Sequence, residues 1–104
     1  MKRVAFKMKL KPGNVTEYKK RHREIWPELV AHIQNNGVGN YSIFLDEDHL
    51  TLFAFQTQSN DFSSTTISED PIMKKWWTFM SDIMEVNEDH SPQMSELEEV
   101  FFLP

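Results

Sequence analysis

The chain has 104 residues, of which 39% are hydrophobic and 26% are charged, a composition typical of one globular domain (residues 1–104) and not of a disordered segment. Its 11 Lys and Arg residues and 16 Asp and Glu residues give a net charge of −5, which argues against a nucleic-acid-binding protein. The absence of cysteine excludes disulfides, thiol nucleophiles and cysteine-based zinc fingers.

The N-terminal segment RVAFKMKLK (residues 3–11) alternates apolar and polar residues, which predicts a β-strand. Val4, Phe6, Met8 and Leu10 would share one face. Because this segment is never a continuous apolar run, it predicts neither a signal peptide nor a membrane span. We therefore expect a cytoplasmic protein with no membrane partner.

A helix is predicted from about Asn14, a possible N-cap, to about Asn36, with Gly37 as the stop signal. Pro27 should kink this helix or start a new one, because proline lacks the backbone N–H donor. Helical spacing places His22 near the centre of an apolar stripe, whose members are Val15, Tyr18, His22, Ile25, Trp26, Leu29 and Ile33.

Two further strands, residues 38–46 and 50–58, are separated by a short EDH turn and predict an antiparallel hairpin. A polar segment follows and predicts a loop with at most one short helical turn. Asp70 and Pro71 then predict a cap and first turn of a second long helix. The C-terminal LEEVFFLP (residues 97–104) predicts a last strand, with Leu97, Glu99, Phe101 and Leu103 on one side.

The predicted fold is α+β, a ferredoxin-like βαββαβ arrangement with a four-stranded antiparallel sheet. Two helices cover only one face of such a sheet, yet several strands carry apolar residues on both faces; Phe44, for example, opposes Ile43 and Leu45. A monomer would expose a large apolar patch. We therefore expect a homodimer packed sheet to sheet.

Tyr18 and His22 are four residues apart, so they are neighbours on one helix face. An imidazole with a pKa near ~6.5 can give and take a proton around neutral pH. The alternative is a structural histidine that is buried and hydrogen-bonded to a carbonyl, with Tyr18 as ordinary packing. The pattern alone does not decide between the two.

Aromatic residues from other elements are further candidates. Two adjacent tryptophans, Trp76 and Trp77, cannot both point into one core, so one of them should border a cavity or an interface. An indole can stack on a sugar or another flat ligand, although core filling is the simpler explanation for Trp76. Tyr41 would line the same pocket if its side of the strand faces the helices, and the dimer interface if it does not.

Motifs for other chemistries are missing. The four histidines and the acidic residues form neither an HExxH motif nor a facial triad, which predicts no metal site. The three glycines form no phosphate-binding loop, and GxSxG is absent. A pocket with an imidazole, phenols and indoles favours cofactor-free proton transfer on a small neutral polar molecule.

The segments EYKKRHREIWPEL, GNYSIFLD, KKWWTFMSDIM and SPQMSELEEVFFLP closely resemble the L-rhamnose mutarotase family over nearly the whole chain. The segment TQSNDFSSTTISED departs most from that pattern and contains none of the matched site residues. The resemblance implies a dimeric α/β-barrel and an isomerase that interconverts the α and β anomers of L-rhamnose without a cofactor. It implies His22 as the proton donor and Tyr18, Tyr41, Trp76 and Trp77 as the residues that bind the sugar.

Two alternatives use the same fold. One is a cofactor-free oxygenase or haem-degrading protein, since those proteins also have aromatic pockets. The other is a non-enzymatic dimer that senses a small molecule, binding it without turnover.

Overall fold

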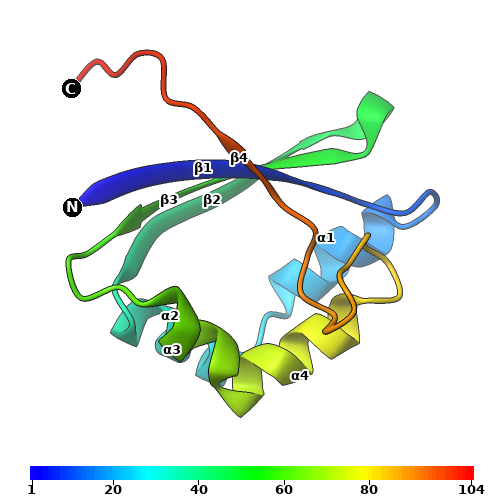
Figure 1. Ribbon diagram of the computed structural model, residues 1–104. Helices are drawn as coiled ribbons and strands as arrows, with labels where there is room; N and C mark the ends of the chain where they lie inside the picture. The colour runs from blue at the N-terminus through cyan, green and yellow to red at the C-terminus, as the bar shows by residue number, and fades with distance from the viewer.

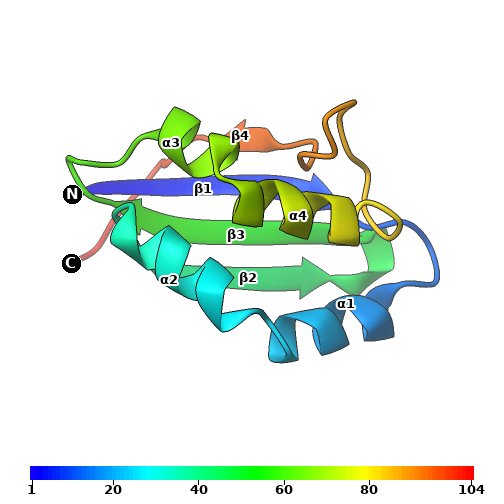
Figure 2. The same ribbon diagram turned by 90° about the horizontal axis from the view of Figure 1, so that it is seen from below.

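The computed structural model describes residues 1–104 and contains one four-stranded sheet with helices on one face only (Figures 1 and 2). In chain order the elements are β1 (Lys2–Lys9), α1 (Val15–Arg23), α2 (Pro27–Asn35), β2 (Val38–Asp46), the 3-10 turn η1 (Glu47–His49), β3 (Thr51–Gln58), α3 (Ser64–Glu69), α4 (Pro71–Met80) and β4 (Ser95–Leu97). The strand order is β2-β3-β1-β4 and every pair is antiparallel. This confirms the predicted ferredoxin-like sheet.

The alternating pattern of the strands sorts their side chains between two environments. Phe6 and Met8 of β1 and Leu52 and Ala54 of β3 are buried beneath the helices, where their neighbours are Leu29 of α2 and residues of α4. The β1–β3 pairing extends from Lys2 opposite Gln58 to Lys9 opposite Thr51. The helices therefore pack on these two central strands of the sheet.

The first predicted helix is two helices, because α1 ends at Arg23 and, after an extended Trp26 (φ −65°, ψ 126°), a new helix starts at Pro27. Proline is well suited to that first position, where its missing N–H costs nothing. Gly37 follows α2 with φ +89°, a left-handed conformation that glycine adopts without strain. Asn14 occupies the N-cap position of α1, but its side chain donates to the carbonyls of Lys11 and Pro12 and does not cap the helix.

The prediction of a last strand over residues 97–104 was wrong. Strand β4 ends at Leu97, and residues 98–104 lie beyond the sheet on the side away from the helices (Figure 1). β4 pairs only with Ala5, Phe6 and Lys7 of β1, and the pairing stops at Leu97 although β1 itself begins at Lys2. An ion pair between Arg3 and Glu99 at 2.9 Å instead holds part of this tail.

The outer face of the sheet is partly apolar. Phe44 and Phe53 are paired across β2 and β3 and are 68% and 39% exposed. Leu97 lies opposite Ala5 at the other edge and is 39% exposed. This is the patch that the alternation of the strands predicted, and no segment of the chain covers it.

Candidate active site

A cavity of about 1490 Å³ lies between the sheet and the helices, which leaves ample room for a monosaccharide. All five residues that the sequence singled out line it: Tyr18, His22, Tyr41, Trp76 and Trp77. They come from three elements, α1, β2 and α4, which are far apart in sequence. The fold therefore brings the candidates to one space.

His22 is oriented by its own helix. Its Nδ1 lies 3.2 Å from the carbonyl oxygen of Tyr18, one turn earlier. Because a carbonyl oxygen only accepts, Nδ1 carries the hydrogen, and Nε2 of the neutral ring keeps a lone pair. Burial lowers the pKa of His22 below its ordinary value of 6.5, and the hydrogen bond to Tyr18 opposes that shift only in part. Neutral His22 is thus the resting form near pH 7, with Nε2 available to a ligand.

Aromatic rings surround this imidazole. The Tyr18 ring lies 4.3 Å from it, centroid to centroid, and the Trp76 ring meets it edge-on at 5.5 Å. Trp76 also contacts Trp26 at 5.0 Å and Phe79 at 5.8 Å, so it is the centre of the aromatic cluster. With 8% of its surface exposed, Trp76 is a core residue that presents one edge to the cavity.

Trp77 differs from its neighbour. It is half-buried, makes none of the aromatic pairs, and lies in the cavity wall. Successive residues of a helix point about 100° apart, so one indole fills the core while the next borders the open space. The sequence argument that only one of the two could occupy the core agrees with this arrangement.

Tyr41 lies on the helix-facing side of β2, which decides the question that the sequence left open. Its ring packs edge-on against Phe6, a residue of the helix-facing side of β1, at 6.5 Å. The residue stays 41% exposed because the cavity that it lines is open on one side. Desolvation by the surrounding protein raises the pKa of Tyr41 to about 12.

Both phenols remain protonated at neutral pH. Burial raises the pKa of Tyr18, and a charge on Tyr41 would raise it further. Tyr18 is buried, yet the protein has no side-chain oxygen or nitrogen that is both inaccessible to solvent and without a hydrogen-bond partner. Its hydroxyl, which has no hydrogen-bond partner in the protein, therefore reaches open space and can donate to a ligand.

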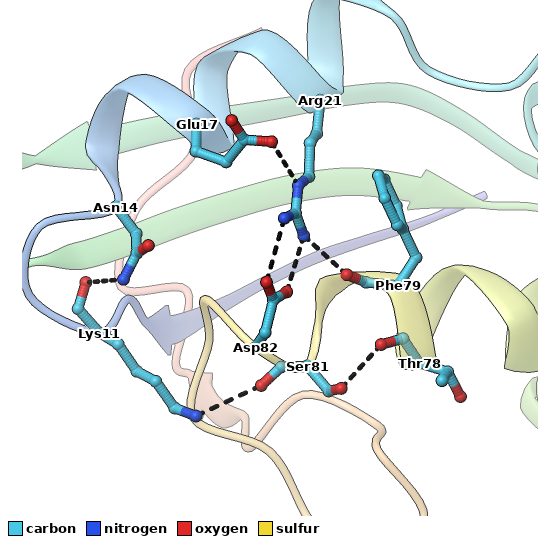
Figure 3. A network of polar contacts seen from close by, with 8 residues as sticks. All are labelled: Lys11, Asn14, Glu17, Arg21, Thr78, Phe79, Ser81 and Asp82. Atoms are coloured by element: carbon cyan, nitrogen blue, oxygen red, sulfur yellow. Dashed lines mark hydrogen bonds and ion pairs between the residues drawn. The ribbon is translucent and has the colours of Figure 1, made fainter.

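A polar cluster holds α1 against the end of α4 (Figure 3). The guanidinium of Arg21 donates to both carboxylate oxygens of Asp82, at 2.8 and 3.2 Å, and to the backbone carbonyl of Phe79 at 2.6 Å. Its Nε donates to Glu17 at 2.8 Å. The sequence analysis did not single out Arg21. The only local signal was the Glu17–Arg21 spacing of four residues.

Other kinds of site find no support in the geometry. No three His, Asp or Glu side chains lie close enough together to hold a metal ion. None of the helices has the length and apolar content needed to cross a bilayer.

Comparison with known proteins identifies the family. The family model described as L-rhamnose mutarotase matches residues 3–103. The chain belongs to the L-rhamnose mutarotase family. It is 52% identical to an L-rhamnose mutarotase of Formosa agariphila over 103 residues, which are 99% of each chain, and equally similar to one from Bacteroides thetaiotaomicron.

Solved structures agree with this placement. A crystal structure of L-rhamnose mutarotase FA22100 from Formosa agariphila superposes with a TM-score of 0.93 at 51% identity and covers both chains completely. A protein of Nitrosomonas europaea whose name suggests an antibiotic biosynthesis monooxygenase superposes with a TM-score of 0.60 at 12% identity, covering 95% of this chain and 89% of its own. That second likeness shows a shared fold alone. Sequence identity therefore links this chain to the mutarotases and not to the monooxygenase-like protein.

Proposed function

We propose that this member of the L-rhamnose mutarotase family interconverts the α and β anomers of L-rhamnose by proton transfer through His22. The observation that supports this best is the orientation of the imidazole. With Nδ1 committed to the Tyr18 carbonyl, Nε2 is the one ring nitrogen left for a ligand in the cavity. The lowered pKa keeps that nitrogen unprotonated at neutral pH, ready to accept a proton.

The reaction then proceeds in two halves. Nε2 takes the proton of the anomeric hydroxyl, and the C1–O5 bond breaks as the C1=O1 double bond forms. The departing ring oxygen takes the proton from the imidazolium, so His22 is the proton donor to the ring oxygen. One nitrogen can serve both oxygens because both are bonded to C1. Rotation about C1–C2 and the reverse steps close the ring as the other anomer, with no net change in protons or electrons.

The remaining candidates bind and orient the sugar. Tyr18 and Tyr41, both protonated, donate hydrogen bonds to sugar oxygens. Trp77 offers an indole face at the cavity wall, where it stacks on the C–H face of the ring or receives the C6 methyl group. Trp76 closes the wall behind His22 and keeps water away from it. General acid–base catalysis of this kind contributes roughly 10²–10⁴-fold.

The assembly is part of the same proposal. Residues 1–104 act as one domain, because the cavity is lined from Lys2 to Glu96. A second copy covers the outer face around Phe44 and Phe53, as in a dimeric α/β-barrel. The cytoplasmic location and the lack of a cofactor, nucleic-acid or membrane partner stay predictions from the sequence.

The test is anomer exchange measured by NMR on L-rhamnose, L-fucose and D-ribose, with and without protein. L-rhamnose exchange should be accelerated more than that of D-ribose, which has no methyl group for the apolar wall of the cavity, and L-fucose, which has one, tests the choice between 6-deoxy sugars. No acceleration of any sugar would contradict the proposal. Oxygen uptake with a quinol, or a Soret band after haem addition, would instead favour the oxygenase or haem-degrading alternative, and binding without acceleration would favour a sensor.

A further inference from the structure

His22 and Trp76 come from different helices, and their separation depends on how α1 is held against α4. His22 is the eighth residue of α1 and Trp76 is in the middle of α4. Their rings lie 5.5 Å apart at 85°, an edge-on contact that a shift of either helix would disturb. The feature that fixes this spacing is therefore relevant to the reaction.

Arg21, the residue before His22, provides that link. Only 11% of its side chain is exposed, although it is a charged residue on a short helix. It donates to the carbonyl of Phe79, in the last turn of α4, where carbonyls have no partner inside the helix (Figure 3). A cation at this end of a helix is also favoured by the helix dipole.

The Arg21 contact has a defined direction as well as a defined distance. The planar guanidinium binds Asp82 through two hydrogen bonds, and Glu17 holds its Nε from the other side. Such paired contacts restrict both position and orientation. The hydrogen bond to Asp82 raises the pKa of Arg21, and the same bond lowers the pKa of Asp82, so both groups are charged at neutral pH.

The same guanidinium also touches the aromatic cluster. It lies 4.3 Å from the centre of the Phe79 ring, which packs against Trp76 at 5.8 Å. Trp76 in turn meets the His22 ring. Arg21 thus reaches the catalytic imidazole by two routes, through the backbone of its own helix and through the Phe79–Trp76 contact.

We infer that Arg21 is a positioning residue for the mutarotase reaction, which it serves by binding Asp82 and the Phe79 carbonyl and so fixing His22 against Trp76. This inference rests on the proposed role of His22. Arg21 touches no substrate. Its contribution is the alignment of His22 with the reacting oxygens, where a misplacement of about 1 Å can cost on the order of 10²-fold in rate.

The test compares variants of Arg21 and Asp82 with the full chain. Arg21→Lys keeps the positive charge but loses the planar guanidinium that makes paired hydrogen bonds. It should lower kcat roughly 10- to 100-fold with little change in KM. Asp82→Asn, at a carboxylate that is 65% exposed, should lower kcat less, because the Phe79 and Glu17 contacts remain. In the double variant kcat should be no lower than in Arg21→Lys, since Asp82 acts through Arg21. Lys20→Met, an exposed position of the same helix outside the cavity, is the matched control.

A geometric readout separates this inference from the proposed function. The nuclear Overhauser effect between the His22 and Trp76 rings should weaken in Arg21→Lys while far-UV circular dichroism stays that of the parent. Unchanged kcat and an unchanged ring contact in a folded variant would overturn the inference, as would a loss equal to that of Lys20→Met. If Arg21→Lys does not fold, Asp82→Asn decides by the same two readouts. If the parent protein does not accelerate exchange, the proposed function fails. The nuclear Overhauser effect between the His22 and Trp76 rings then tests on its own whether Arg21 positions His22.

Discussion

The two adjacent tryptophans should differ sharply when each is replaced by alanine. Trp76 is 8% exposed and makes three aromatic contacts, with His22, Trp26 and Phe79. Truncating a buried tryptophan to alanine costs about 3–5 kcal/mol, which includes the cavity left behind. At about 4 °C per kcal/mol for a domain of this size, Tm should fall by roughly 12–20 °C.

Trp77 is half-buried in the cavity wall and makes none of these contacts. Its replacement should cost about 1 kcal/mol, in line with burial of part of one side chain. Urea unfolding followed by far-UV circular dichroism measures both values without relying on the indoles that are removed. Trp77→Ala should still raise KM for L-rhamnose. Equal destabilisation by the two substitutions, or a larger one from Trp77→Ala, would refute the assignment of core and cavity positions.

Four further outcomes are expected. Because the pKa of His22 is below 6.5 in the folded protein, kcat/KM should be level near pH 7 and fall as acid protonates Nε2; a rise toward low pH would contradict this. The unfolded chain takes up that proton at higher pH than the folded protein, so the free energy of unfolding should fall as pH drops through about 6.5. The urea midpoint should therefore decrease between pH 7.5 and 5, and His22→Gln should make this decrease smaller. Tyr41→Phe should keep the stability and raise KM, since its hydroxyl has no protein partner; unchanged kinetics would remove Tyr41 from the site. Phe44→Glu should give a monomer in sedimentation velocity, because it puts a charge on the apolar outer face; a dimer would place the interface elsewhere.

Local patterns predicted most of this fold. The alternation in β1 grouped Val4, Phe6 and Met8 on one face, and Pro27 marked the break between α1 and α2. Which side of β2 faces the helices was left open by the sequence. Two of the candidate residues could also be found from local sequence, since the four-residue spacing of Tyr18 and His22 puts both on the buried side of one helix.

Features that depend on distant partners were not predictable from local patterns. The alternation in residues 97–104 predicted a strand, yet the pairing with β1 stops at Leu97, and residues 98–104 leave the sheet. The Arg21–Asp82 pair joins residues 61 positions apart. His32 was not among the predicted site residues, and its Nε2 lies 3.2 Å from the carbonyl of Ile67 in α3, a helix that the serine-rich segment did not predict beyond a single turn.

The most direct test of the account is the exchange rate of L-rhamnose anomers with the parent protein and with His22→Ala at equal concentration. The account predicts that the substitution removes most of the acceleration, a loss of roughly 10²-fold or more, while circular dichroism shows an intact fold. His22→Ala with undiminished acceleration would mean that another group moves the protons and that the orientation of the imidazole has no part in the reaction.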